Sequence, residues 1–355
     1  MPILFKNPIK KNPLKQMAWF VTFSLASLMA SGQAKDSADF YFQKGLTEKQ
    51  NGRRLESLKQ FEKATKFDAG NKPVLNELAS AYLDLRKYPQ AIETYKKLVD
   101  LGDATANNYK QLLILSFNFK NYDDVIFYAD KLKNADPSEK VNYYLGKVHY
   151  DKDNYGDAIR HLNAAAKEDP KNAEIPYMIA RSYSDMMNYK QAIPYFLKAI
   201  DLDTSKHYWV YELGLVYDAM NDNKNALKYI KEAGDRGLTK DNAYMENLGI
   251  AYMNAGDLDN GVAIMNEILK RKPSDINILN MVAEGYYDKG KYQEAIDYWD
   301  RILSYDKQNA SALYMIGLSF QKKGEKAKGQ QLCDKAIEMD PSLSNLRQKK
   351  MTMGM

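Results

Sequence analysis

The sequence predicts an all-α fold, a superhelical solenoid of about nine repeated helix pairs. Three observations lead to this prediction. A Gly or Ala recurs about every 34 residues and is followed 12 residues later by a second small residue. Apolar residues within each copy follow helical spacing, and several copies close with proline. A fixed period of this length is typical of stacked repeats, in which each unit is a pair of elements that packs against its neighbours.

The small residues of each copy are expected at the contact between its two helices, because helices approach closely only where the facing side chains are short. Four copies show the small residues most clearly: Gly146, Ala158 and Ala165; Ala180, Ala192 and Ala199; Gly214, Ala226 and Ala233; Gly317, Gly329 and Ala336. An aromatic residue often follows the first small residue by three positions: Tyr82, Tyr183, Tyr217, Tyr252, Tyr286 and Phe320.

The fifth copy illustrates the two helices. Ala180 and Tyr183 belong to the first, and Ala192, Phe196 and Ala199 have the i, i+4, i+7 spacing of the second. A proline cannot continue a helix, so it marks the end of a copy. The closing prolines are Pro137, Pro170, Pro273 and Pro341.

This pattern resembles the tetratricopeptide repeat family over about 306 of the 355 residues. The predicted repeats are 38–71, 72–105, 106–138, 139–172, 173–206, 207–240, 242–275, 276–309 and 310–343, within a solenoid over 35–343. Some repeats depart from the pattern. The first has Lys44, Glu48 and Arg54 at positions that are usually apolar. The third has Leu113, Ser116 and Val125 in place of a small, an aromatic and a small residue. The second and sixth end without proline, near Gly102 and near Gly234 and Gly237, where we expect local irregularity. A polar first repeat suits a solvent-facing end cap.

Residues 1–34 have the composition of a secretory signal peptide. Four lysines without acidic residues precede an apolar run over residues 17–29, and small residues follow. The run is shorter than the ~20 residues that span a bilayer. We expect cleavage near Gln33 or Ala34 and a periplasmic or secreted protein; the end of this segment also resembles signal peptides of the Bacteroidetes. The alternative is an uncleaved membrane anchor, which would give membrane contact through this segment alone.

Loss of residues 1–34 would remove four of the positive charges, so the net charge of +5 would fall to about +1. No strongly basic balance remains, and nucleic acid is not an expected partner. At the other end, residues 344–355 are predicted to form a capping helix and tail, with Leu343 and Leu346 covering the last apolar face.

The sequence gives little sign of catalytic chemistry. Cys333 occupies a position that other repeats fill with Phe or Trp, which indicates a buried structural role. His149, His161 and His207 lie in separate contexts without the spacing of a metal site. Phosphate-binding glycine loops and nucleophile motifs are absent from the sequence. We therefore expect a protein that is not an enzyme and has no cofactor and no catalytic or metal-binding residues.

The resemblance implies that the first helices line a concave groove through repeat positions 2, 5, 9 and 12. Position 5 is tyrosine in three consecutive repeats, and cations or further tyrosines lie nearby. The candidate partner-binding residues are Tyr143, Lys147, Tyr150, Tyr177, Arg181, Tyr208 and Tyr211. Tyrosine offers a large contact area and a hydroxyl group, which suits an extended peptide. These tyrosines fit equally well a role in packing between neighbouring first helices.

The expected function is a non-enzymatic scaffold of the bacterial cell envelope that binds peptide segments or assembly subunits in its groove. Two alternatives remain: a membrane-anchored architectural subunit of envelope or secretion machinery, and a receptor for glycan or peptidoglycan with the tyrosines as stacking platforms. Partner identity, pathway, oligomeric state and the face that binds stay open.

Overall fold

The computed structural model describes residues 35–344, and all regular elements in this range are helices. The predicted all-α class is therefore confirmed. The signal peptide predicted over 1–34 lies outside the described residues, as does the capping segment after Ser344. Among residues 35–344, no helix combines the length and apolar character needed to cross a bilayer.

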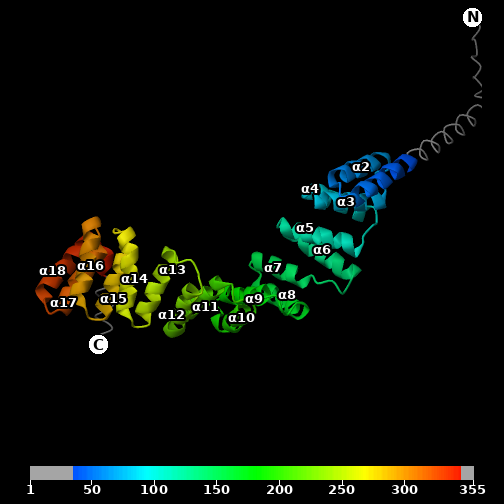
Figure 1. Ribbon diagram of the computed structural model, residues 1–355. Helices are drawn as coiled ribbons and strands as arrows, with labels where there is room; N and C mark the ends of the chain where they lie inside the picture. The colour runs from blue at the N-terminus through cyan, green and yellow to red at the C-terminus, as the bar shows by residue number, and fades with distance from the viewer. Residues whose placement is uncertain (1–34, 345–355) are drawn as a thin grey trace, which may run out of the picture. The chain divides into compact units, whose positions relative to one another are not determined.

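The chain forms two compact units that divide after Asn154, inside the predicted fourth repeat. The first unit contains a helix over residues 35–50 and then α2 (Arg54–Phe67), α3 (Lys72–Asp84), α4 (Tyr88–Asp100), α5 (Ala106–Asn118), α6 (Tyr122–Ala135) and α7 (Asn142–Asp151) (Figure 1).

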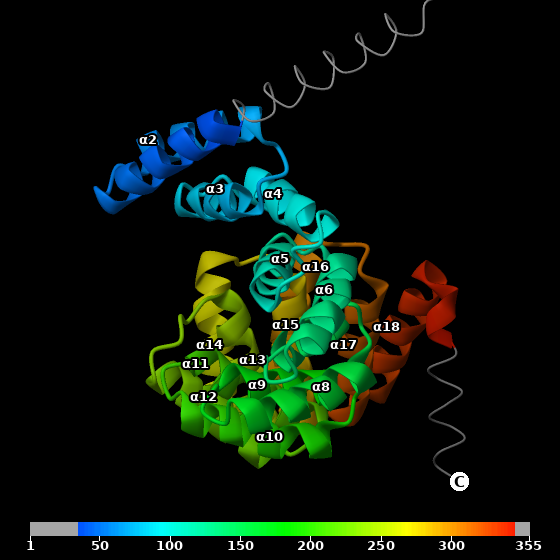
Figure 2. The same ribbon diagram turned by 90° about the vertical axis from the view of Figure 1, so that its right-hand side faces the viewer.

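The second unit begins at Tyr155 and contains the remaining elements. These are α8 (Tyr155–Glu168), α9 (Glu174–Asp185), α10 (Tyr189–Leu202), α11 (His207–Ala219), α12 (Asn223–Asp235), α13 (Asn242–Asn254), α14 (Leu258–Arg271), α15 (Ile276–Asp288), α16 (Tyr292–Tyr305), α17 (Ala310–Lys322), α18 (Lys326–Met339) and the short 3₁₀ helix η1 (Pro341–Leu343). Within each unit, from α2 to α7 and from α8 to α18, each helix packs against the next along the chain. The helices α15 to α18 show this side-by-side arrangement in both views (Figures 1 and 2).

The two helices of a pair approach closely at their small residues. A methyl group added at Gly317 on α17 would lie 2.7 Å from Cys333 Sγ and 2.8 Å from the Gly329 carbonyl oxygen of α18. Both distances are shorter than van der Waals contact, so no side chain fits at this position without a shift of backbone. Where the small residue is alanine, as at Ala192 and Ala226, its side chain is fully buried.

The recurring aromatic residue of the first helix packs on the second helix of the same pair. Three of these tyrosines face a second tyrosine, with ring centroids separated by 5.8 Å in Tyr183–Tyr195, 5.4 Å in Tyr217–Tyr229 and 5.8 Å in Tyr286–Tyr298. Aromatic pairs at such distances add stability beyond the area they bury. The aromatic position of the repeat therefore joins the two helices at the end opposite to the interrepeat loop.

The turn within every pair has one residue in the left-handed region of backbone conformation. These residues are Gly52, Arg86, Lys120, Asp153, Met187, Asn221, Gly256, Gly290 and Gly324. The next amide closes the first helix: Lys87 N donates to the Tyr82 carbonyl oxygen at 2.8 Å. This bond satisfies a carbonyl that the helix end would otherwise leave unpaired.

The second and sixth repeats end differently from the others, as their lack of proline suggested. Gly102 after α4 and Gly237 after α12 have φ values of +81° and +107°. The residue that follows each glycine closes the helix by a hydrogen bond to a carbonyl oxygen five residues earlier. Asp103 N donates to Leu98 O at 2.8 Å, and Leu238 N donates to Ala233 O at 3.0 Å. Glycine thus ends these two helices by the same motif that closes the first helix of each pair.

The apolar core runs between the helices of each unit, and its largest fully buried side chains are Trp299, Phe61 and Phe196. Cys333 occupies the equivalent position in the last pair and is 4% exposed, which confirms its predicted burial. Leu343 of η1 is buried with Cys333 and Ala336. This leucine covers the end of the core as expected, whereas Leu346 lies outside the described residues.

Replacing Gly324 by alanine is expected to lower the free energy of unfolding by about 1 kcal/mol, because an L-residue at φ +96° is strained. No atom lies within 4 Å of the added methyl group, so the change reports backbone conformation alone. Urea unfolding followed by circular dichroism measures it. Gly156→Ala is the matched control: its site is equally open but helical without a positive φ, and its stability should stay the same or rise. Equal midpoints for the two variants would contradict the assignment.

Candidate functional site

The predicted site residues are divided between the two units. Tyr143, Lys147 and Tyr150 lie on α7 of the first unit, whereas Tyr177 and Arg181 on α9 and Tyr208 and Tyr211 on α11 belong to the second. Within the second unit, Tyr177 contacts Arg181 and Tyr208 contacts Tyr211, on the neighbouring first helices α9 and α11. In the first unit Tyr143 is partly buried, with its ring centroid 6.4 Å from Phe117 of α5.

Tyr177 packs between neighbouring first helices. Its ring stacks on Trp209 of α11 with a centroid distance of 4.4 Å and an interplanar angle of 15°. Its edge also meets Phe196 of α10 at 6.1 Å. One face and one edge of the Tyr177 ring are thus occupied by residues of the protein. Tyr177 therefore presents less of its ring to a partner than its repeat position suggested.

Arg181 is held by an ion pair within the protein. Its Nη1 atom donates to Glu212 Oε1 at 3.0 Å and to the Tyr177 hydroxyl oxygen at 3.3 Å. Glu212 lies on α11 with its side chain 12% exposed. Burial raises the pKa of the Glu212 carboxyl group above its ordinary value, and the nearby Tyr177 hydroxyl and Arg181 only partly oppose this shift. Arg181, expected to meet carboxylates of a partner, already meets one of its own chain.

Sequence reasoning missed Glu212, although a signal was present. Oppositely charged residues 28 to 31 positions apart in neighbouring repeats form several ion pairs. These are Lys49–Glu77, Lys96–Asp124, Lys110–Glu139, Lys152–Asp123 and Arg181–Glu212. A search for opposite charges 28 to 31 positions apart, slightly less than one period, would have found all of them.

Tyr211 is 7% exposed and is fixed by the neighbouring repeat. Asn247 Nδ2 of α13 donates to its hydroxyl oxygen at 2.6 Å, and the Tyr244 ring centroid lies 5.9 Å away. Burial raises the pKa of the Tyr211 hydroxyl. These contacts correspond to the packing role that the sequence left open for this tyrosine.

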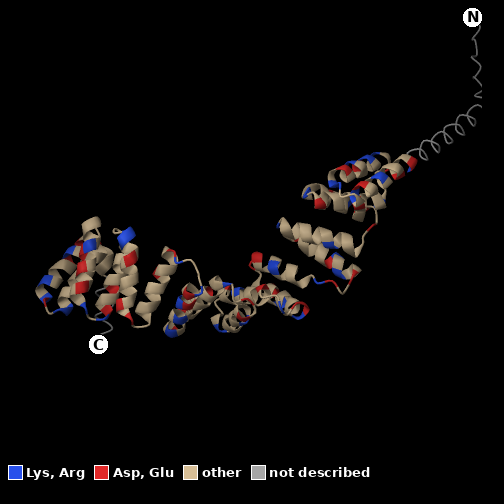
Figure 3. Ribbon diagram, in the orientation of Figure 1, with Lys and Arg blue, Asp and Glu red and all other residues tan. Residues whose placement is uncertain are grey.

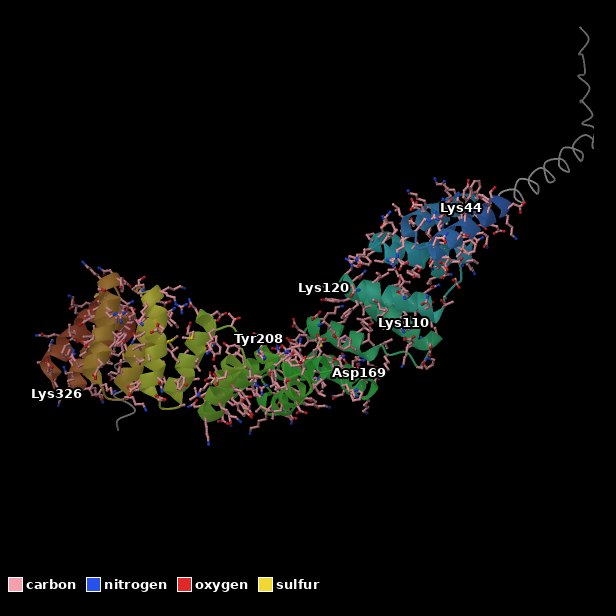
Figure 4. The ribbon with its side chains drawn as sticks, viewed as in Figure 1. Lys44, Lys110, Lys120, Asp169, Tyr208 and Lys326 are labelled. Carbon is pink, nitrogen blue, oxygen red and sulfur yellow. The ribbon has the colours of Figure 1, made fainter. Side chains whose placement is uncertain are left out.

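Tyr208 is the accessible aromatic residue of α11, with 52% of its surface exposed. Its ring centroid lies 5.8 Å from that of Tyr211, so the exposed ring packs against a buried one. Figure 4 labels Tyr208 in the second unit. An exposed ring held by a buried one keeps a fixed orientation and has little side-chain entropy to lose on binding.

A pocket of about 280 Å³ opens between the first helices α13 and α15. Ile250, Met253 and Met281 contribute apolar side chains to its lining, and Glu284, Asp288 and Lys289 contribute charged ones. A hydrophobic pocket whose charged groups sum to a negative charge suits an apolar side chain next to a basic one. These residues occupy ordinary positions of the repeat, so no motif in the sequence distinguishes them.

Charges of both signs are mixed along the helices of each unit (Figure 3). Among residues 35–344, no three His, Cys, Asp or Glu side chains cluster as they would around a metal ion.

Comparisons with known proteins agree with this architecture. A family model described as tetratricopeptide repeat matches residues 42–109, 211–276 and 282–344, more than half of the chain. A model described as subunit 3 of the anaphase-promoting complex, or cyclosome, matches residues 118–199. A search of curated proteins gives no match.

Solved structures resemble the chain in fold alone. The C-terminal part of a TPR repeat-containing protein from Cytophaga hutchinsonii is 16% identical, covers 78% of this chain and 99% of its own, and has a TM-score of 0.47. YrrB, described as a TPR protein with an unusual peptide-binding site, is 21% identical over 53% of this chain and 97% of its own, with a TM-score of 0.42. The TPR domain of P58(IPK) is 15% identical over 81% and 98%, with a TM-score of 0.28.

The variant Glu212→Gln is expected to be more stable than the unmodified protein at pH 7.5, because glutamine removes a buried charge and keeps an acceptor for Arg181. The raised pKa sets the sign of the pH dependence. The ionised carboxylate disfavours the folded state above that pKa, and this effect disappears as pH falls toward the ordinary value of 4.5. The gain should therefore shrink between pH 7.5 and pH 4.5 in urea unfolding. Glu338→Gln, on the exposed side of α18, is the control; a gain from Glu212→Gln that does not change with pH would contradict the prediction.

Proposed function

This chain belongs to the tetratricopeptide repeat family. On that premise we propose that it is a protein–protein interaction scaffold. We propose further that it binds peptide segments on its first-helix face, the surface formed by the first helices of successive repeats, such as α11, α13 and α15. The observation that carries the proposal is the exposed Tyr208 on α11, supported by the buried Tyr211. Tyrosines of this kind are common anchors of protein interfaces. The repeat fold gives such an anchor a rigid support.

The pocket between α13 and α15 suggests the chemistry of the peptide. Its methionine and isoleucine side chains favour an apolar residue. Glu284 and Asp288 outnumber Lys289, the one cation of the lining, and so favour a neighbouring Lys or Arg. The pocket and Tyr208 belong to the first helices of repeats that follow one another, α11, α13 and α15. Tyr208 is the second residue of α11, whereas the pocket is lined by the C-terminal halves of α13 and α15, so the two features lie toward opposite ends of the first helices.

The alternative of a glycan receptor receives less support from the geometry. It relied on Tyr143, Tyr177 and Tyr211 as stacking platforms. Tyr177 stacks on Trp209, Tyr211 is buried, and Tyr143 is partly buried near Phe117. Stacking on a sugar needs an open ring face, which leaves Tyr208 alone among these tyrosines of α9 and α11.

We also propose that the scaffold works in the bacterial cell envelope after export. The support is the composition of residues 1–34: lysines, then an apolar run, then small residues. An uncleaved segment would instead make the protein a membrane-anchored architectural subunit.

Replacing Tyr208 by alanine is expected to weaken partner capture about tenfold or more, because loss of a central tyrosine removes contact area that the partner covers. Affinity purification from envelope fractions with quantitative mass spectrometry measures the effect. Tyr305→Ala is the matched control: Tyr305 is 51% exposed, close to the 52% of Tyr208, but lies on the second helix α16. Undiminished capture by Tyr208→Ala, or equal loss in both variants, would reject the first-helix face as the binding surface.

The exported protein is expected to lack residues 1 to about 33, and its intact mass tests this directly. A mass that corresponds to a start near Ala34 or Lys35 supports cleavage. A mass that still includes the apolar run over residues 17–29 would instead support the membrane-anchored alternative.

A further inference from the structure

A second pocket, of about 430 Å³, lies in the last two repeats and differs in chemistry from the pocket between α13 and α15. It is formed where α15 and α17 end and α18 begins. Its lining consists of Tyr287, Leu318, Gln321, Lys322, Lys326 and Gln330. Figure 4 labels Lys326 at this end of the last repeat. The lining contains two cations, two amides and a phenol, and it contains no carboxylate.

Neither lysine of the lining is neutralised within the described part of the chain. Their neighbours differ: Lys323 bonds to Gln293 and lies 3.7 Å from Glu325, and Lys328 lies 3.9 Å from Glu325. Lys322 and Lys326 make no ion pair or side-chain hydrogen bond with residues 35–344. Two unpaired ammonium groups on one pocket give it a positive potential.

The Tyr287 hydroxyl is a third group that lacks a partner. Its oxygen is buried, and no residue between 35 and 344 forms a hydrogen bond with it. The ring is held by Trp299 and Tyr292, with centroid distances of 5.9 and 5.4 Å. A buried hydroxyl without a hydrogen bond costs about 1–3 kcal/mol, and such groups in folded proteins usually meet a water, an ion or a ligand.

Other carboxylates on these elements are engaged elsewhere or lie outside the lining. Glu325 is near Lys323 and Lys328, and Asp334 accepts a hydrogen bond from Gln330 at 2.7 Å. Asp288 follows Tyr287 in sequence but lines the pocket between α13 and α15 instead. The charge of Lys322 and Lys326 is therefore left for a ligand.

We propose that this pocket, here named the Lys322–Lys326 pocket, binds an oxyanion: the carboxylate of a peptide or a phosphate group. Either anion accepts hydrogen bonds from the two ammonium groups, and the unpartnered Tyr287 hydroxyl is the further donor available in the lining. A volume of about 430 Å³ holds an acidic side chain or a chain-terminal residue. The proposal does not depend on Tyr208, because the pocket is formed by α15, α17 and α18 and not by α11.

Isothermal titration of the full chain at low ionic strength tests the proposal. One arm uses acetyl-Gly-Glu-Gly-amide with acetyl-Gly-Gln-Gly-amide as its neutral counterpart, and the other uses inorganic phosphate. Saturable binding of the Glu peptide but not of phosphate identifies a carboxylate site, and the reverse identifies a phosphate site. No saturable heat from either anion at millimolar concentration, or equal binding of the Gln peptide, overturns the proposal.

Variants locate the binding in the pocket. Lys322→Gln and Lys326→Gln should each weaken the dissociation constant about tenfold, the usual effect of losing one charge-assisted hydrogen bond. Tyr287→Phe should weaken it about threefold or more while thermal stability is kept or raised, because the unpaired hydroxyl is removed. Lys335→Gln is the matched control, an exposed lysine of α18 outside the pocket. If Lys335→Gln weakens binding as much as the pocket variants do, the anion responds to net charge alone and the site is disproved.

Discussion

Close approach between the two helices of each pair is the constraint on which the rest of the structure depends. At Gly317 and Gly329 the backbones meet so closely that a methyl group would contact main-chain atoms. Because the helices lie this near, the aromatic residue three positions on reaches the second helix, as in Tyr183 and Tyr195. The side of the first helix that faces away from its partner helix is then available for contacts with neighbouring repeats. Overpacking this contact would therefore disturb both the pair and the surface it presents.

The fold was largely predictable because its determinants are local and periodic. Small residues, aromatic positions and closing prolines repeat with the chain, so each copy supports the same interpretation. The left-handed turn residue was less predictable. Five repeats have Arg86, Lys120, Asp153, Met187 and Asn221 at the position that glycine holds in the other four. A glycine in every repeat would have marked this turn position in the sequence. Because five repeats have other residue types there, the position is found only by counting along the repeat.

The candidate site was less predictable than the fold, because it depends on contacts between repeats rather than within them. Repeat position placed Tyr177, Arg181 and Tyr211 on the first helices, but their exposure follows from residues one period away. Trp209 covers Tyr177, Glu212 binds Arg181, and Asn247 fixes Tyr211. Position within a repeat thus indicates the helix and its face. The identity of the neighbouring side chain decides whether a residue packs or remains accessible.

The distribution of turn residues has a consequence for the order in which the repeats form. In the first repeat and in the last three the turn is made by glycine: Gly52, Gly256, Gly290 and Gly324. The second to sixth repeats use residues with side chains in the same strained conformation. Each strained turn lowers the intrinsic stability of its own repeat, and in a linear array every repeat contributes separately to the total. Gly52 stands alone in the first repeat, whereas the last three repeats have glycine turns in succession. Folding that starts where several adjacent repeats have the lowest local cost would begin at the C-terminal end and extend toward the N-terminus, against the direction of synthesis.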